Sequence, residues 1–385
     1  MAVIALKSNN NNLKENLLAI FKELNYSPKR KIFIKPNFSG RPPLIPGENS
    51  DPEFIKILAE TLLENGAQEI IIGHGGLLGT ADRKYPFEQI IEGGGFGFLK
   101  KISGVRLLNL DNDPKEEIKS DLLTFHIPRI LKEVDSYINL AKVKAHMEAT
   151  VSFALKNQMG LIAMEDRINM HRTNLESTIS QLGKIIKPDL NIIDGIIAME
   201  GNGPHHGQPK ELNLLIAGTD MVETDSLLCD LLNIDAQSVT HITEAEKIGV
   251  GHMTTNEIKQ KFSQLKASDF QQALRYEKFG KNIYVWPTTS CSRCITALNE
   301  SGKLIKKNPL KHLNLVRKIF FGNKKINLVI GKAQNLNLPK GEKIICFGHC
   351  SKEFADKNQL GCLDKCPPTV GEAFEYLKKE TNKKQ

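Results

Sequence analysis

Six of the seven cysteines of the chain lie in its C-terminal quarter, and their spacing is typical of a metal site. Cys291 and Cys294 form a C-x2-C pair, and a C-x3-C-x11-C-x3-C-P-P run follows over residues 346–368. A C-x2-C turn sets two thiolates on one side of a loop, which suits zinc or one face of an iron–sulfur cube. Because 385 residues can bury a full core, stabilisation of the fold alone does not explain this cluster.

Four ligands are enough for either metal, so two of these six cysteines are spare. Cys291 and Cys294 belong together, and Pro367 follows Cys366 as a proline follows the last ligand in bacterial ferredoxin runs. The proline favours iron–sulfur over zinc. We predict a 4Fe-4S cluster, with zinc as the alternative, on Cys291, Cys294, Cys350 and Cys366, with Cys346 and Cys362 as further candidates.

A second group of chemically capable residues lies in the segment KVKAHMEATVSFALKNQMG (142–160). It contains Lys144, His146, Lys156 and Asn157 near the end of an apolar run. Such a group could bind a carboxylate or phosphate, with the histidine as acid, base or ligand. The alternative is that the lysines are surface charges and that His146 is a capped histidine.

The segment DGIIAMEGNGPHHG (194–207) is the third candidate. Asp194, Glu200, Asn202 and the pair His205-His206 lie among glycines that can turn backbone amides toward a ligand. Carboxylates beside histidines could hold a metal or transfer protons. A solvated, glycine-rich surface loop is the other interpretation.

The elements that position these loops are short apolar runs typical of strands buried on both faces. They cover residues 31–37, 69–76, 104–110, 136–142, 190–196 and 212–218. Helical patterns lie between them, at 54–62 behind Asp51 and Pro52 and at 175–186. The alternation predicts an α/β fold, a mostly parallel sheet with helices on both faces. Chemistry is then expected at the carboxyl ends of the strands.

We expect a large α/β domain over residues 1–250, a connecting segment over 251–281 and a small cysteine-rich α/β domain over 282–385. In the small domain, residues 282–287, 325–333 and 342–348 have strand patterns and residues 369–379 have the pattern of a closing helix. This small domain would be the metal-binding one.

The amino-acid composition of the chain limits the classes of molecule that it is expected to bind. No apolar stretch approaches the length of a membrane span and no leader pattern opens the chain, so we expect a cytoplasmic protein without a membrane partner. The net charge of +8 is spread out and aromatic residues are few, which disfavours nucleic acid and favours small anions. Walker A, G-x-G-x-x-G and G-x-S-x-G motifs are absent from the sequence.

Six ordered segments resemble the family called domain of unknown function 362. They are IKPN (34–37), residues 50–75, INLAKVKAH (138–146), ALKNQMGLI (154–162), residues 188–209 and AGTDMVETDSL (217–227). Members of that family are often iron–sulfur proteins and have no settled activity. The N-terminal part is also distantly similar to nickel-pincer lactate racemases, but likeness of fold does not fix function.

The resemblance implies one shared site in the large domain. Its catalytic positions would be Lys144, His146 and Glu200, and its ligand-binding positions would be Lys35, Asn37, Lys156, Asn157, Asp194, Asn202 and Asp225. The favoured hypothesis is an iron–sulfur redox protein or oxidoreductase that takes a small anionic substrate and exchanges electrons with a partner protein. The alternatives are a non-redox, isomerase-like metal enzyme with a structural zinc tail, and a binding protein.

Overall fold

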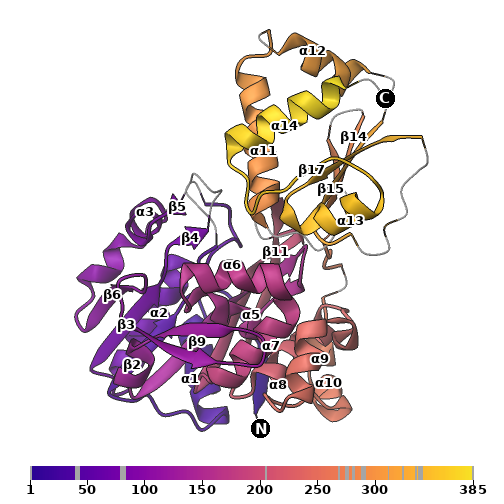
Figure 1. Ribbon diagram of the computed structural model, residues 1–385. Coiled ribbons are helices and arrows are strands. Elements are labelled where there is room, and N and C mark those ends of the chain that lie inside the picture. The colour runs from indigo at the N-terminus through magenta and orange to yellow at the C-terminus, as the bar shows by residue number, and fades with distance from the viewer. Residues whose placement is uncertain are drawn as a thin grey trace. The chain divides into compact units, whose positions relative to one another are not determined.

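The computed structural model describes residues 2–39, 44–78, 84–203, 206–267, 269–273, 277–279, 282–287, 292–310, 312–322, 325–333, 336 and 341–383. The chain forms two compact units, Met1–Leu77 with Tyr85–Ala273 and Leu78–Lys84 with Leu274–Gln385 (Figure 1). Each unit has its own sheet.

The sheet of the first unit confirms the predicted mostly parallel arrangement. Its strands lie in the order β1 (Val3–Lys7), β12 (His206–Gly218), β11 (Leu190–Asn202), β9 (Ser136–His146), β2 (Lys31–Lys35), β3 (Glu69–His74) and β6 (Val105–Asn109), and β10 (Thr150–Ser152) pairs with β9. From β11 to β6 all neighbours are parallel, while β12, near one edge, pairs antiparallel with both β11 and β1. The carboxyl ends of β2, β3, β9 and β11 therefore meet at one side of the sheet.

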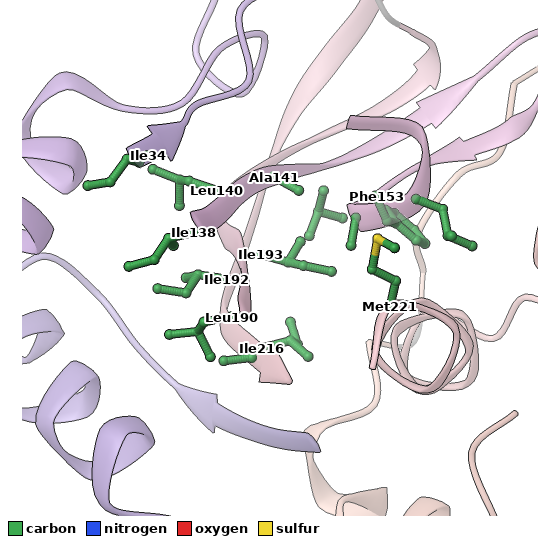
Figure 2. Packing of buried hydrophobic residues seen from close by; sticks show 14 of the residues in the cluster. Ile34, Ile138, Leu140, Ala141, Phe153, Leu190, Ile192, Ile193, Ile216 and Met221 are labelled. Atoms are coloured by element: carbon green, nitrogen blue, oxygen red, sulfur yellow. The ribbon is translucent and has the colours of Figure 1, made fainter. Parts of the chain in front are cut away.

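Helices connect these strands. They are α1 (Leu13–Glu23), α2 (Pro52–Glu64), α3 (Phe87–Gly93), α4 (Ile130–Glu133), α5 (Ala154–Asn157), α6 (Met164–Thr173), α7 (Leu175–Ile185), α8 (Met221–Leu231), α9 (Thr240–Lys247) and α10 (Asn256–Lys261). The start of α2 is as predicted, because Asp51 Oδ1 accepts from the backbone N–H groups of Glu53 (2.9 Å) and Phe54 (3.1 Å). Apolar strand residues such as Ile34, Leu140 and Ile192 form the core with the helices (Figure 2).

The prediction of a glycine-rich loop at 194–207 is wrong for most of its length. Instead β11 and β12 extend into a long antiparallel hairpin, paired as far as Asn202 and His206. Close approach of the two strands explains a glycine here: a Cβ at Gly207 would lie 2.5 Å from the carbonyl oxygen of Glu200. Strands β7 (Lys115–Lys119) and β8 (Thr124–Pro128) form a second hairpin that the sequence patterns did not predict.

The second unit carries the six clustered cysteines. Its sheet has the order β13 (Glu277–Phe279), β14 (Ile283–Pro287), β15 (Ile326–Ile330), β16 (Lys343–Phe347) and β17 (Cys362–Leu363), and all pairs except β13–β14 are parallel. The helices include α11 (Ser292–Lys307), α12 (Leu313–Val316), α13 (Lys352–Lys357) and α14 (Val370–Asn382). A capping box of Thr369 and Glu372 begins α14, the predicted closing helix. No helix in the described ranges combines the length and apolar character that a membrane crossing needs.

Candidate functional site

Two rows of polar side chains cross the sheet of the first unit, one on each face. Lys35, Asn139 and Asn191 are register neighbours on β2, β9 and β11. Lys142 and Asp194 are neighbours on β9 and β11, and Lys142 is three positions after Asn139. Because successive side chains of a strand point to opposite faces, these two sets lie on opposite faces of the sheet.

Asn157, at the end of α5, organises the first row. Its Oδ1 accepts from Lys35 Nζ (2.8 Å) and Asn37 Nδ2 (2.9 Å), and its Nδ2 donates to Asn139 Oδ1 (2.8 Å) and the carbonyl of Leu140 (3.2 Å). Since an ammonium group can only donate, Lys35 fixes which end of the amide faces it. The row continues from Asn139 Nδ2 to Asn191 Oδ1 (2.9 Å). These bonds hold the side chain of Asn157 in one orientation.

Asn37 connects the first row to Lys144 at the end of β9. Its Oδ1 accepts from Lys144 Nζ at 2.5 Å. The other two N–H groups of Lys144 reach Ser39 Oγ (2.6 Å) and the carbonyl of Glu48 (3.0 Å). All three acceptors are uncharged, and Lys144 is 1% exposed. Burial lowers the pKa of Lys144 to about 7, against the attraction of the Glu48 carboxylate.

Lys35 is a second buried lysine of this region with a lowered pKa. It is 1% exposed, and it donates to two neutral oxygens, Asn157 Oδ1 and the carbonyl of Pro36 (2.9 Å). Its pKa lies well below the ordinary lysine value because of burial first, and then because of the positive charges of Arg167, Lys144 and Lys156. Lys35 therefore lies in a buried region with an excess of positive charge.

His74, at the end of β3, lies beside Lys35. Its Nδ1 is 2.6 Å from the carbonyl oxygen of Gly75, so Nδ1 carries the proton and Nε2 has the lone pair. Burial and the charge of Lys35 depress the pKa of His74 well below its usual range. A neutral imidazole with a lone pair on Nε2 can accept a hydrogen bond from a bound ligand. The GHGG segment gave only a weak signal in the sequence, and His74 was not predicted as a site residue.

Gly160 explains how Lys35 and His74 approach each other. A Cβ at this position would lie 2.6 Å from Lys35 Nζ and 2.7 Å from His74 Nε2. A side chain at position 160 would overlap both groups, so glycine lets the ends of Lys35 and His74 lie against the backbone here. The three residues and Lys156, which is half-buried with its pKa lowered by burial to about 8, form what we call the Lys35 site.

On the opposite face, Lys142 and Asp194 form a buried ion pair. Lys142 Nζ lies 2.6 Å from Asp194 Oδ2, and the two side chains are 2% and 1% exposed. Asp194 Oδ1 accepts from the backbone N–H of Ile196 (3.0 Å). Lys142 was not predicted; a lysine inside the apolar run 136–142 was the signal that could have identified it.

Asp225 and His146 position the site. The carboxylate of Asp225 accepts from the N–H groups of Ala154 (2.8 Å) and Leu155 (3.0 Å), so it anchors the start of α5, which carries Lys156 and Asn157. Burial raises the pKa of Asp225 to about 7, against these two donors. His146 Nδ1 accepts from the N–H groups of Glu148 and Ala149 (both 3.1 Å), which closes the turn between β9 and β10.

Glu200 and Asn202 lie on the β11–β12 hairpin. Glu200 Oε2 accepts from the backbone N–H of Gln271 (2.9 Å), and Asn202 is the register partner of His206. Within the described ranges no hydrogen bond or ion pair joins Glu200 to the Lys35 site. His205 lies outside the described residues.

In the second unit, backbone contacts connect the segments that carry three of the predicted ligands. A Cβ on Gly348 would lie 2.8 Å from Cys294 Sγ, and Gly348 is two residues before Cys350. The next N–H, of His349, donates to the carbonyl of Lys365, which precedes Cys366. Cys291 lies outside the described residues, and among those that are described no set of three or more Cys, His, Asp and Glu side chains is arranged to hold a metal.

The two spare cysteines have different environments. Cys346 is fully buried in a small core with Val329, Ala333 and Ala355, and burial raises the pKa of its thiol to about 12. Cys362 is half-buried opposite it on the neighbouring strand, with Sγ 3.6 Å from the carbonyl oxygen of Gly348. Since metals bind thiolates, burial disfavours Cys346 as a ligand.

We expect Gly160→Ala to weaken the binding of a small anion such as oxalate about tenfold, because the new methyl group would displace Lys35 Nζ from Asn157. Calorimetric titration would measure the change. Gly97→Ala is the matched control, since a Cβ there meets nothing within 4 Å. Equal affinity of both variants for oxalate would contradict the assignment of this site.

Comparison with known proteins places this network inside a recognised sequence family. The family model of DUF362, a domain of unknown function, matches residues 32–230. A thylakoid-associated protein of Synechocystis is 27% identical over 235 residues, which cover 58% of this chain and 69% of that protein. The matched family segment contains Lys35, His74, Lys144 and Asn157.

Two solved structures are similar at low identity. A crystal structure of a Thermotoga maritima protein covers 94% of this chain and 93% of its own, with 12% identity and a TM-score of 0.41. The lactate racemase apoprotein from Thermoanaerobacterium thermosaccharolyticum covers 65% of this chain and 57% of its own, with 13% identity and a TM-score of 0.37.

Proposed function

The chain belongs to the DUF362 family, and from this premise and the Lys35 site we propose that it binds a small anion in its first unit and a 4Fe-4S cluster in its second. The anion is a carboxylate or a phosphate. The protein would then be a redox protein in which the anionic compound is substrate or effector.

The observation that carries the first half is the environment of Lys35. In the described part of the chain, the ammonium group of Lys35 is buried, bonded to neutral oxygens only and repelled by three further cations, which is costly for the folded protein. An anion beside it would offset that cost. Buried cations whose pKa is shifted by burial and by neighbouring charges are also typical of functional sites.

The contacts suggest a role for each residue. Lys35 makes two hydrogen bonds in the described part of the chain, which leaves one of its three N–H groups for the anion. Lys156 would supply a second donor, and Lys144, whose N–H groups are all engaged, would contribute charge. His74 Nε2 would accept a hydrogen bond from a protonated group of the ligand.

The second half of the proposal depends on the cysteines. Cys294, Cys350 and Cys366 lie on segments connected by the contacts of Gly348 and His349, and this neighbourhood supports the proposal that they hold the cluster with Cys291 as the fourth ligand. A bound cluster would supply one-electron transfer. The thiolates of this chain would hold it.

Metal analysis tests this half. We expect protein purified without oxygen to contain about four iron and four sulfide ions per chain, with a broad absorption band that bleaches on reduction. Cys294→Ser should lower the iron content severalfold, while Cys362→Ser, a matched change in the same unit, should retain it. Loss of iron in the second variant alone would contradict the ligand assignment.

Zinc at about one per chain without sulfide would replace the redox proposal with the alternative, a non-redox enzyme with a structural zinc unit. The proposal for the Lys35 site would survive that result, since it depends on the first unit only.

A further inference from the structure

A cavity of about 340 Å³ opens on the face of the first sheet that carries Lys142 and Asp194. Its lining includes Asn49, Asp51, Lys142, Asp194, Ile196 and Ile197. None of these residues takes part in the function proposed above. A volume of this size is at the lower end of the range of small-molecule sites in proteins.

The cavity is formed by an irregular stretch of β11. Its pairing with β9 shifts register between Asp194 and Met199, and its pairing with β12 shifts between Gly195 and Ile197. The segment that leads into α2 covers this stretch closely, because a Cβ on Gly47 would lie 2.4 Å from the carbonyl oxygen of Ala198. The walls are therefore backbone elements that pack closely against each other.

Lys142 supplies unused donors. Its ammonium group has three N–H groups, and in the described part of the chain its hydrogen bond to Asp194 Oδ2 is its single one. Because the side chain is 2% exposed and belongs to the lining of the cavity, a ligand there that offers an oxygen acceptor would satisfy these donors.

Asp51 supplies an unused acceptor. Both hydrogen bonds that cap α2 use its Oδ1, and no described residue donates to Oδ2. Asp194 already balances the charge of Lys142, so Asp51 leaves the charged groups of the lining with an excess of negative charge. This favours an ammonium group in the ligand. Ile196 and Ile197 are apolar residues of the lining, which suits an aliphatic body.

We propose that this cavity binds an α-amino acid with an aliphatic side chain. The carboxylate accepts from Lys142, the ammonium group donates to Asp51 Oδ2, and the side chain packs on Ile196 and Ile197. The site is separate from the Lys35 site, because it lies on the other face of the sheet and contains none of the same side chains.

Calorimetric titration with three matched probes tests the proposal. L-Leucine presents all three features, 4-methylpentanoate lacks the ammonium group and 3-methylbutylamine lacks the carboxylate. We expect leucine to bind and each of the other two to bind at least about tenfold more weakly. Absence of leucine binding, or equal affinity for leucine and 4-methylpentanoate, would overturn the proposal.

Two variants provide the controls. Asp51→Asn retains an N-cap oxygen for α2 but removes the charge, so leucine should bind about tenfold more weakly. Asn10→Trp changes an exposed lining residue and should block the cavity without loss of thermal stability. Oxalate binding at the Lys35 site should be unchanged in both, which separates this proposal from the first. Leucine binding unaffected by either variant would place the ligand elsewhere and contradict the assignment.

Discussion

Asp194→Asn should lower the free energy of unfolding by about 3–5 kcal/mol, the cost of leaving a buried charge without its partner. Lys142 would keep its ammonium group in a position that is 2% exposed and would lose the carboxylate at 2.6 Å. The new amide still accepts from the N–H of Ile196, so the change isolates the ion pair. Denaturant unfolding monitored by circular dichroism would measure it.

The control is the double variant Lys142→Met with Asp194→Asn. Because it removes the buried cation as well, it should recover most of the lost stability. Recovery distinguishes an unpaired charge from a general packing defect. If the double variant is as unstable as Asp194→Asn, the ion pair does not explain the effect.

Lys35→Met should lower the affinity for oxalate or phosphate about 10- to 100-fold, which is the range expected for loss of a charge-assisted hydrogen bond. The same change should leave the free energy of unfolding unchanged or raise it by about 1–2 kcal/mol, since it removes a buried cation that has neutral partners only. Loss of binding without loss of stability is the signature of a residue retained for function.

The matched control is Lys31→Met. Lys31 lies on the same strand, but it is partly exposed and its ammonium group is 3.9 Å from Glu69 Oε2. Its replacement should change neither anion affinity nor stability by more than about 0.5 kcal/mol. Equal loss of binding in both variants would indicate a general electrostatic effect and not a site at Lys35.

Most of the fold could be predicted because buried parallel strands and capped helices have local signals. The apolar runs correspond to β2, β3, β6, β9, β11 and β12, and Asp51 and Pro52 begin α2 where the sequence placed them. The hairpin extension of β11 could not be predicted, because its stability depends on pairing with β12 and not on its own composition. Glycines at 201, 203 and 207 suggested a loop, whereas Gly207 allows the two strands to approach closely.

The site was predictable in part. Lys144 and Asn157 were identified from the residues of segment 142–160, and Lys35 and Asn37 from the family resemblance. The structure joins these four residues in one hydrogen-bonded network. His74 and the Lys142–Asp194 pair depend on distances across strands, which sequence spacing does not give. Asp225 has a positioning role, because its two acceptors are taken by the start of α5.

The most direct test of the central claim, that the first unit binds a small anion beside Lys35 and Lys144, is calorimetric titration with oxalate in two buffers of different ionisation enthalpy. The pKa of Lys144 is about 7 in the free protein, so at about pH 8 most of this group is neutral. A bound anion favours the charged form and raises that pKa. Binding should therefore take up protons at about pH 8, where Lys144 is mostly neutral in the free protein. Absence of oxalate binding, or binding without proton uptake at about pH 8, would contradict the account.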